Sequence, residues 1–542
     1  MSGKIDASPI SASGKPTAEW APEIIHQTSR QKPPTIVARV PPEILGCIFQ
    51  MSIDPVLPWD HDARFPGIQP DPYNFLLVCH YWYEVARCTP ELWSSWGNNL
   101  GDWKRRRPFS NSSPLDLMLD WQGHRTGTFD GTLRHALKGR SARDLVRKVH
   151  IRTPKEELLA SIISLLTPKG EEIRHSSIES IVLPNLRVDV ANFLSRHHFP
   201  KLQNLHVSGR SDFVLDHLKL HTAALINLSL GNDSVLVGCT STIPQILSLL
   251  ASNPRLQTIT LDLRIANHDI RSDCMLQVPL RHLKRFSLRM NFRPALAILH
   301  RLGFPEGMDE VDLFFLGCTL NQITQTVGPY IQDHFQAYER SKAKLCVATE
   351  IHARCCTLET RVVGVVDESH NRGPSKTTFS MMLPRGNSNE ERDGLFIDIL
   401  TLLPRGLIVH LDVGLFTGVA AVTEGLLVTM PNVEVLRVAN AVISDRFLLP
   451  DPDGQNARKK LLPSLRWLYL DYPVEVDNDQ WEHLVKYLTY QTSGGQTTSL
   501  GVAGPTVCIH LELRKRISDL VEQFIYSTDP SDSCPRCCPD EL

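Results

Sequence analysis

The sequence predicts a mixed α/β protein in which three short helices precede a long array of strand and helix units. Two observations favour this fold. Near the start of the chain, residues 40–49 and 75–96 form blocks rich in Trp and apolar residues at helical spacing. From about residue 115 onward, short strand-like pieces alternate with helix-like ones. A chain of 542 residues exceeds what one compact core usually holds, so we expect several domains or a repeat array.

The first predicted helix begins at Pro41-Pro42-Glu43. Proline suits the first position of a helix, and a glutamate there complements the positive end of the helix dipole. Apolar residues then follow at helical spacing: Ile44, Leu45, Ile48 and Phe49. A short amphipathic helix is therefore expected.

Two further helices follow a proline-rich loop over residues 54–71. Asp71-Pro72 combines a helix N-cap with proline at the next position. The second helix is expected to carry one continuous apolar stripe: Phe75, Val78, Cys79, Trp82, Val85 and Ala86. Thr89-Pro90-Glu91 repeats the cap and predicts a third short helix with Leu92, Trp93 and Trp96. Three small helices cannot bury a large core alone, so this unit needs a neighbour or a partner.

An apolar triplet at relative positions 1, 4 and 6 recurs in the rest of the chain. Its clearest copies are Leu202-Leu205-Val207, Leu225-Leu228-Leu230, Leu256-Ile259-Leu261, Leu283-Phe286-Leu288, Val433-Leu436-Val438 and Leu465-Leu468-Leu470. Looser copies begin at Val146, Ile178, Met308, Ile408 and Cys508. Four of the clear copies have a proline two residues before the first apolar residue. Successive copies from residue 178 to residue 308 lie 24, 23, 31, 27 and 25 residues apart.

This spacing is near that of leucine-rich repeats, which measure about 20 to 29 residues. Segments 212–220, 242–253 and 294–303 lie between copies and have helix-like apolar spacing. An irregular leucine-rich-repeat-like α/β solenoid accounts for both periodicities, because each unit buries its apolar edge against its neighbours. The rival, a doubly wound α/β domain, would need a glycine-rich phosphate turn after a strand, and the sequence has none.

Between about residues 320 and 405 the triplet pattern fails. Residues 345–356 and 361–370 have the composition of strands, while 371–378 and 385–394 have that of loops.

Taken together, these patterns divide the chain into a disordered tail (1–37), a helical module (38–97), a repeat region (98–526) and a flexible cysteine-containing tail (527–542).

Charge and composition exclude several classes of function. The 57 Lys and Arg balance 59 Asp and Glu, so no positive field would hold a nucleic acid. The most apolar long stretch, 411–430, contains Asp412 and Glu424, which argues against a membrane span. The start of the chain lacks the apolar stretch of a secretory signal, and 13 scattered cysteines fit reduced thiols. We expect a location in the cytoplasm or nucleus.

We find no catalytic or cofactor motif in the sequence. A Gly-x-Ser-x-Gly elbow, a Walker phosphate loop and a His-Glu-x-x-His helix are all absent. Cys534, Cys537 and Cys538 near the end of the chain begin like a zinc site, but a tetrahedral site needs a fourth ligand and none is nearby. The sequence therefore predicts no enzyme activity, no cofactor and no metal site.

The N-terminal blocks resemble the F-box, a module of three helices that docks a protein onto the adaptor subunit of a cullin-RING ubiquitin ligase. Residues 40–49, VPPEILGCIF, match the family pattern Leu-Pro-x-Glu-Ile-Leu-x-x-Ile-Phe with Val at the usual Leu. Residues 78–82, VCHYW, match Val-Cys-basic-x-Trp with His at the basic position. The loop at 54–71 is longer than in the compact module, and residues 89–93, TPELW, are similar to the large F-box families of mushroom-forming fungi.

This resemblance implies a substrate-recognition subunit of an SCF-type ligase, with a Skp-family adaptor, a cullin complex and an unknown target protein as partners. The residues it implies for adaptor binding, shared between the module's own core and the adaptor, are Pro41, Pro42, Ile44, Leu45, Ile48, Phe49, Leu76, Cys79, Trp82, Leu92 and Trp93. In the repeats, residues between the triplet positions should line the open face of the sheet. Those with side chains suited to target binding are Arg285, Arg289, Arg437, Trp467 and Tyr469.

Two alternatives stay open from the residues alone: a repeat scaffold, and an unrecognised enzyme, against which stands the lack of a convergent set of catalytic residues. The N-terminal helices could instead cap a non-catalytic leucine-rich-repeat scaffold, because terminal repeats need a protected edge.

Overall fold

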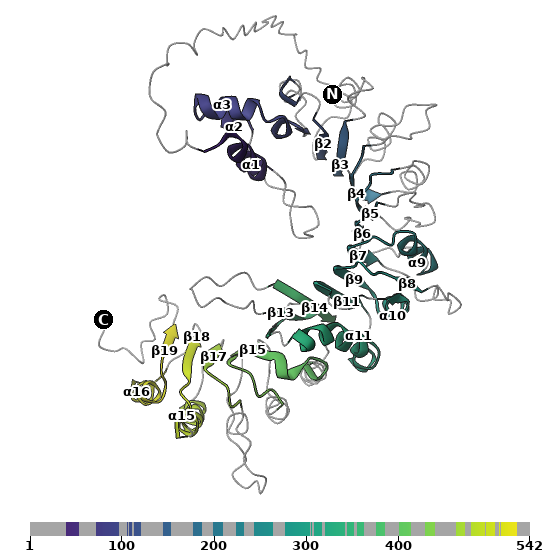
Figure 1. Cartoon of the computed structure of the whole chain (residues 1–542). Helices are drawn as coiled ribbons and strands as arrows, with labels where there is room; N and C mark the ends of the chain where they lie inside the picture. Colours follow the sequence, from purple (N-terminus) through teal and green to yellow (C-terminus); the bar gives the residue numbers. More distant parts are fainter. Residues whose placement is uncertain are drawn as a thin grey trace, which may run out of the picture. The chain divides into compact units, whose positions relative to one another are not determined.

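We describe the protein from a computed structural model of the chain (Figure 1). The residues that the structure describes are 40–53, 72–96, 106, 108–110, 113–120, 145–152, 177–186, 199–209, 224–231, 243–263, 277–303, 305, 308–316, 320–341, 344–351, 355–362, 376–384, 400–413, 429–439, 462–471, 478–493, 495–503, 509 and 511–527. Several predictions lie outside them: the tail at 1–37, the loop at 54–71, the helix-like segment 212–220, the copy at Cys508 and residues 528–542 with their three cysteines.

The chain divides into two compact units. Unit 1 comprises residues 1–93 and 107–111, and unit 2 comprises residues 94–106 and 112–542. Each has a buried apolar cluster of its own among the described residues.

Unit 1 is built from short helices around an aromatic core. The helices are α1 (Pro42–Ile53), α2 (Tyr73–Leu76), α3 (His80–Arg87) and the 3-10 helix η3 (Pro90–Trp93). Six side chains form its buried core: Leu45, Phe49, Val85, Ala86, Leu92 and Trp93. The predicted start of α1 at Pro42 is confirmed, and Glu43 lies in its first turn.

The prediction of one continuous second helix is wrong, because the chain turns at Leu77 and Val78 between α2 and α3. Cys79 adopts an extended conformation (φ −162°, ψ 168°), and its Sγ accepts a hydrogen bond from the backbone N–H of Trp82 at 3.5 Å. Cys79 therefore caps α3 instead of lying within a longer helix. The third predicted helix ends at Trp93, so Trp96 lies in a strand.

Unit 2 contains a sheet of 17 described strands, most of them parallel. Its first part runs in chain order, and each strand pairs with the next in parallel: β1 (Ser95–Trp96), β2 (Leu115–Asp120), β3 (Val146–Arg152), β4 (Ser180–Leu186), β5 (Asn204–Gly209), β6 (Asn227–Gly231), β7 (Thr258–Leu263), β9 (Arg285–Asn291) and β11 (Glu310–Leu316). Its last part is also parallel: β15 (Ile408–Val413), β16 (Val435–Ala439), β17 (Trp467–Asp471), β18 (Ser499–Ala503) and β19 (Phe524–Ser527).

An antiparallel insertion joins these two parts and explains why the triplet pattern fails there. The strands β12 (Leu345–Ile351), β13 (Cys355–Val362) and β14 (Lys376–Pro384) pair antiparallel, while β14 pairs parallel with β11 and β12 parallel with β15. The strand expected at 345–356 ends at Ile351, and the next strand begins at Cys355 and includes the start of the one expected at 361–370, of which residues 363–370 lie outside the described ones. β14 begins at Lys376, within the segment expected to be a loop.

Helices cover the face of the sheet that carries the leucines. They are α9 (Ile243–Ala251), α10 (Phe292–Leu299), α11 (Leu320–Ser341), α15 (Asn478–Ser493) and α16 (Leu511–Leu520), with the 3-10 turn η6 (Arg405–Leu407). Buried residues of these helices belong to the same apolar cluster as the strands, for example Leu247, Ile298, Phe335 and Leu484. α9 confirms the helix predicted at 242–253, and α10 confirms the first part of the one predicted at 294–303, where residues 302–303 instead form a strand. Two short strands, β8 (Val278–Pro279) and β10 (Leu302–Gly303), form a separate pair, and β8 contacts α9.

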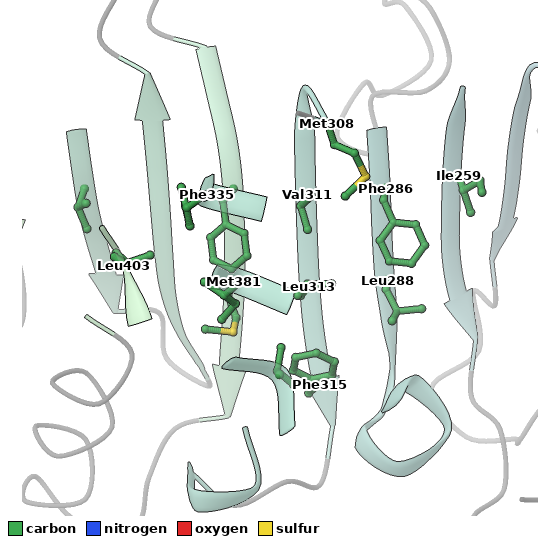
Figure 2. Close-up of a cluster of buried hydrophobic side chains, with 14 of the residues drawn as sticks. Ile259, Phe286, Leu288, Met308, Val311, Leu313, Phe315, Phe335, Met381 and Leu403 are labelled. Atoms are coloured by element: carbon green, nitrogen blue, oxygen red, sulfur yellow. The ribbon is translucent and has the colours of Figure 1, made fainter. Parts of the chain in front are cut away.

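Every residue of the six clear apolar triplets is buried. The last two positions of each triplet are alternate residues of a strand, so they point to one face, and the first lies in the turn before it. Figure 2 shows the result, with Phe286, Leu288, Val311, Leu313 and Met381 lying in rows across neighbouring strands. A mixed α/β fold with a large parallel sheet is thus confirmed. The finer predictions of a solenoid and of an F-box stay predictions.

Candidate interaction surfaces

Large exposed apolar side chains concentrate in unit 1. Among the described residues six such side chains are exposed, and five of them belong to this unit: Ile44 (53%), Ile48 (41%) and Met51 (71%) on α1, and Leu77 (81%) and Val78 (56%) in the turn between α2 and α3. The three on α1 are spaced at i, i+4 and i+7, so they share one face of the helix. We call these five side chains the exposed apolar set.

The opposite side of α1 is fixed by the aromatic core. The ring of Phe49 stacks on Phe75 with 4.4 Å between centroids and lies 5.0 Å from the Trp82 ring. Trp93 is fully buried, and its Nε1 donates to the carbonyl of Ala86 at 2.7 Å. Because these contacts hold Leu45 and Phe49 inward, Ile44 and Ile48 are directed to solvent.

Two close contacts set how α1 sits on the rest of unit 1. The hydroxyl of Tyr81 on α3 donates to the backbone carbonyl of Val40, just before α1 begins. Gly46 is buried, and a Cβ atom added there would lie 3.2 Å from Oγ1 of Thr89. α1 therefore packs closely against the residues that follow α3.

The structure places the predicted adaptor-binding residues in three groups. Exposed are Pro41, Pro42, Ile44 and Ile48, half-buried are Leu76, Cys79 and Trp82, and buried are Leu45, Phe49, Leu92 and Trp93. The predicted residues were expected to be shared between the module's own core and the adaptor. The four buried residues belong to the core. Sequence reasoning missed Met51, although it continues the stripe of Ile44 and Ile48. It also missed the exposure of Leu77 and Val78, because a continuous helix was expected there.

Side chains on the other face of the sheet pair across strands in its first part. Asp116 on β2 accepts from both Nε and Nη2 of Arg147 at 3.1 Å each, and Lys148 Nζ lies 3.2 Å from the same carboxylate. Further cross-strand pairs are His150 with Ser180 (3.2 Å), Asn204 with Asn227 (2.5 Å), His206 with Ser229 (2.8 Å) and Ser287 with Asp312 (3.0 Å). This face is therefore a polar ladder whose groups largely bond to one another.

Burial changes the titration of one ladder residue. His150 is only 4% exposed, and its burial, followed by the charge of Lys148, lowers its pKa to about 4. The carboxylate of Asp116 opposes this shift, and His206 adds to it. His150 is therefore neutral at physiological pH.

Each of the three arginines predicted to bind a target forms an ion pair with an acid on a neighbouring strand. Arg285 lies 3.7 Å from Glu310, Arg289 lies 3.8 Å from Asp262, and Arg437 lies 3.5 Å from Asp412. Arg289 also covers the ring of Phe314, with 4.6 Å from Cζ to the centroid. Their side chains remain about half exposed, so a target would have to compete with these pairs.

The two predicted aromatic residues lie together near the other end of the sheet. The rings of Trp467 and Tyr469 on β17 are stacked with 5.5 Å between centroids and 7° between planes. Both are half-buried. The structure thus separates the predicted target-binding residues into paired arginines and one aromatic pair.

The described part of the chain contains neither a cluster of metal-binding side chains nor a helix suited to cross a membrane. No group of three or more His, Cys, Asp or Glu side chains is arranged to hold a metal ion there. None of the helices described is both long and apolar enough to cross a membrane.

No family model matches the chain, and no curated protein is similar to it.

Proposed function

We propose that the protein is the substrate-recognition subunit of an SCF-type cullin-RING ubiquitin ligase. Unit 1 docks on a Skp-family adaptor and a cullin complex, and unit 2 binds a target protein. The chemistry of ubiquitin transfer then belongs to other subunits, so this chain itself is no enzyme and needs no cofactor. Such a role places it in the cytoplasm or nucleus.

The observation that carries the proposal is the exposed apolar set of unit 1. An apolar side chain left in water forgoes about 1.5 to 3 kcal/mol of burial free energy, and exposed clusters of this kind mark interaction sites. Three of the five lie on the two stretches that resemble the F-box, since Ile44 and Ile48 belong to VPPEILGCIF and Val78 begins VCHYW, and Met51 and Leu77 lie within two residues of these stretches. The resemblance and the exposure thus favour the same surface.

Unit 2 supports the other part of the proposal, the binding of a target protein. Along its described parallel strands, as in β7 and β9, polar side chains alternate with buried apolar ones, so the polar side chains share one open face. A leucine-rich-repeat-like solenoid, the finer architecture that we propose for unit 2, offers this kind of extended binding face.

Co-purification with a Skp-family adaptor tests the docking. The double variant Ile44→Asp, Ile48→Asp places two charges on the exposed face of α1 without touching the buried core. Ile525→Asp is a matched control, because Ile525 is an equally exposed isoleucine (49%) in unit 2. We expect the wild type and Ile525→Asp to bind the adaptor equally and the double variant to bind at least about tenfold more weakly.

Two results would overturn the proposal: failure of the wild-type chain to bind any Skp-family adaptor, or equal binding by the double variant. Leu45→Asp is not a useful test, because Leu45 is 2% exposed and a buried charge would unfold the unit.

A second function, a repeat scaffold capped by the helices, is favoured by one observation. In chain order the helices directly precede β1, the first described strand of the sheet, because η3 ends at Trp93 and β1 begins at Ser95. Deleting residues 1–93 separates the two functions. A docking module should leave unit 2 with its cooperative thermal transition, whereas removal of a cap should abolish that transition.

A further inference from the structure

Basic residues gather at the edge of the sheet where the strands β5, β7 and β9 begin. Lys201 precedes β5, Arg255 precedes β7, and Arg281 and Lys284 precede β9. All four are exposed, as is His282 between the last two. We call Lys201, Arg255, Arg281 and Lys284 the basic edge.

The strand register places the basic edge on one side of the sheet. The first residues of β5, β6, β7 and β9 pair in parallel, each with the next. Backbone hydrogen bonds continue this register into the turns, since the amide of Gln257 donates to the carbonyl of Ile226 and that of Lys284 to the carbonyl of Gln257, at 2.7 Å each. Neighbouring strands lie about 4.8 Å apart, so the edge from β5 to β9 is about 14 Å long.

The basic edge differs from the open face in the pairing of its charges. On the open face, Arg289 and Arg437 each have an acid of a neighbouring strand within 4 Å. Within the described part of the chain, none of the four residues of the basic edge forms an ion pair or a side-chain hydrogen bond. Their charges are therefore available to a ligand.

Acids bound the basic edge on both sides. Glu179 precedes β4, and Asp309 precedes β11. The other charges close by are Arg285, which lies 3.7 Å from Glu310, and the half-buried Arg301. The described turn residues before β5, β6, β7 and β9 contain no acid. A local positive charge thus remains on a chain whose total charge is slightly negative.

These cations act together on a ligand. The Debye length at physiological salt is about 8 Å, which exceeds the spacing between neighbouring strands. A negatively charged group at the edge is therefore attracted by more than one cation at a time. Lysine and arginine also donate charge-assisted hydrogen bonds to carboxylates, which are stronger than those between neutral groups.

The length of the basic edge favours a short peptide over a nucleic acid. A DNA duplex carries a charge about every 1.7 Å and would continue past the edge toward Glu179 and Asp309. An extended peptide rises about 3.3 Å per residue, so about four or five residues cover 14 Å. Acids at alternate positions of such a segment lie on one side and bring two or three carboxylates to the edge.

We propose that the basic edge binds a short extended segment of another protein with Asp or Glu at alternate positions. The inference rests on the proposed function, since the segment would belong to the target of the ligase. It also assigns the target a chemistry, because the acids bounding the edge repel a longer run of negative charge.

Fluorescence polarisation with the full-length chain tests the inference without using the adaptor. The probe is a rhodamine-labelled peptide of repeated Asp-Ser units, and peptides of repeated Asn-Ser and Lys-Ser and a single-stranded DNA of equal charge serve for comparison. We expect saturable binding of the Asp-Ser peptide, much weaker binding of the other three, and loss of affinity as salt is raised, because salt screens the attraction.

Charge reversal locates the binding. Arg255→Glu and Lys284→Glu should each weaken binding of the Asp-Ser peptide by about tenfold. Arg466→Glu is the matched control for Lys284→Glu, because Arg466 is exposed and directly precedes β17 as Lys284 directly precedes β9. It should leave binding unchanged. The triple variant Lys201→Glu, Arg255→Glu, Lys284→Glu should prefer the Lys-Ser peptide. Circular dichroism checks that each variant is folded.

Several outcomes would overturn the inference: no binding by the wild type, equal binding of the Asn-Ser peptide, or equal binding by folded Arg255→Glu and Lys284→Glu. Tighter binding of the DNA would assign the edge to a nucleic acid instead. Equal weakening by Arg466→Glu would mean that only the total charge matters. The Ile44→Asp, Ile48→Asp variant should bind the Asp-Ser peptide normally, so failure of this inference and failure of adaptor docking are separate results.

Discussion

Unit 1 and unit 2 use their apolar residues in opposite ways. Among the described residues, unit 2 buries every residue of its clear apolar triplets, while unit 1, with six buried core side chains, leaves five large apolar side chains exposed. Size is the physical reason, because a small unit has too little interior to cover its own apolar surface. The difference is the one that the proposed docking function requires, because unit 1 keeps an apolar surface that a partner could cover, whereas the strands of unit 2 cover one another's apolar residues.

Truncation in the centre of the unit 2 core should have the largest effect. Phe286 on β9 is 1% exposed and lies between Ile259 and Val311 in the rows of Figure 2. We expect Phe286→Ala to lower the free energy of unfolding by about 3 to 5 kcal/mol, because it leaves a cavity that the sheet cannot close. Urea denaturation of the full chain measures this loss. A loss below about 1 kcal/mol would contradict tight packing around Phe286 in the core of unit 2.

Stability of unit 2 should also fall in mild acid through His150. The pKa of His150 is about 4 in the folded protein and 6.5 in the unfolded chain. The unfolded chain therefore binds a proton first as the pH falls, so stability is full above pH 6.5, declines toward pH 4 and is level below it. The difference corresponds to about 3 kcal/mol.

Unfolding curves between pH 7 and pH 4 measure this decline. His150→Asn keeps a polar group near Ser180 but does not titrate, so its stability should fall by about 3 kcal/mol less over the same range. Parallel pH profiles for the two proteins would contradict the assignment to His150.

Loss of a hydrogen bond in the unit 1 core should have a smaller effect, confined to that unit. Trp93→Phe removes the donor to the carbonyl of Ala86 and leaves part of a buried site unfilled. We expect a destabilisation of about 1 to 3 kcal/mol. Hydrogen exchange should then speed up at the amides of α1 and α3 while those of β5 to β9 are unchanged. Equal acceleration in both units would contradict their independence.

The smallest effect is expected for the ion pairs on the open face of unit 2. Arg289 and Asp262 are both partly exposed, so their attraction is screened by water. A double-mutant cycle with Arg289→Ala and Asp262→Ala should give a coupling of about 0 to 1 kcal/mol. A coupling well above this range would mean that the polar ladder stabilises the sheet as strongly as part of its core.

The sequence predicts the repetitive part of the fold better than its interruptions. The triplets anticipate β5, β6, β7, β9, β16 and β17, because in-register parallel strands give the same apolar spacing each time. The antiparallel strands β12 to β14 were only partly predicted, since their neighbours come from distant parts of the chain. The break at Cys79 was not predicted, because Cys79 and Trp82 fit a helical stripe whether or not the helix is continuous.

For the site residues too, the sequence pattern predicts the spacing but not the contacts between distant residues. The stripe on α1 predicts Ile44 and Ile48 as a surface, but periodicity alone does not say which of Ile44 and Leu45 faces the core. That choice depends on the packing of Phe49 against Phe75 and Trp82. Pairing of the arginines was likewise beyond the sequence, because each acid lies on a neighbouring strand 25 to 27 residues away. Trp467 and Tyr469 were named from the sequence as target-binding residues and this stays a prediction, whereas the stacking of their rings depends on packing that the sequence does not specify.

Adaptor binding by unit 1 is the central claim, and one titration tests it most directly. Purified full-length chain is titrated with a Skp-family adaptor in a calorimeter, in parallel with the Ile44→Asp, Ile48→Asp variant and the Ile525→Asp control. We predict stoichiometric binding with a negative heat-capacity change for the wild type and the control, and binding weakened by at least about tenfold for the double variant. Absence of binding by the wild type, or identical isotherms for all three proteins, would contradict it.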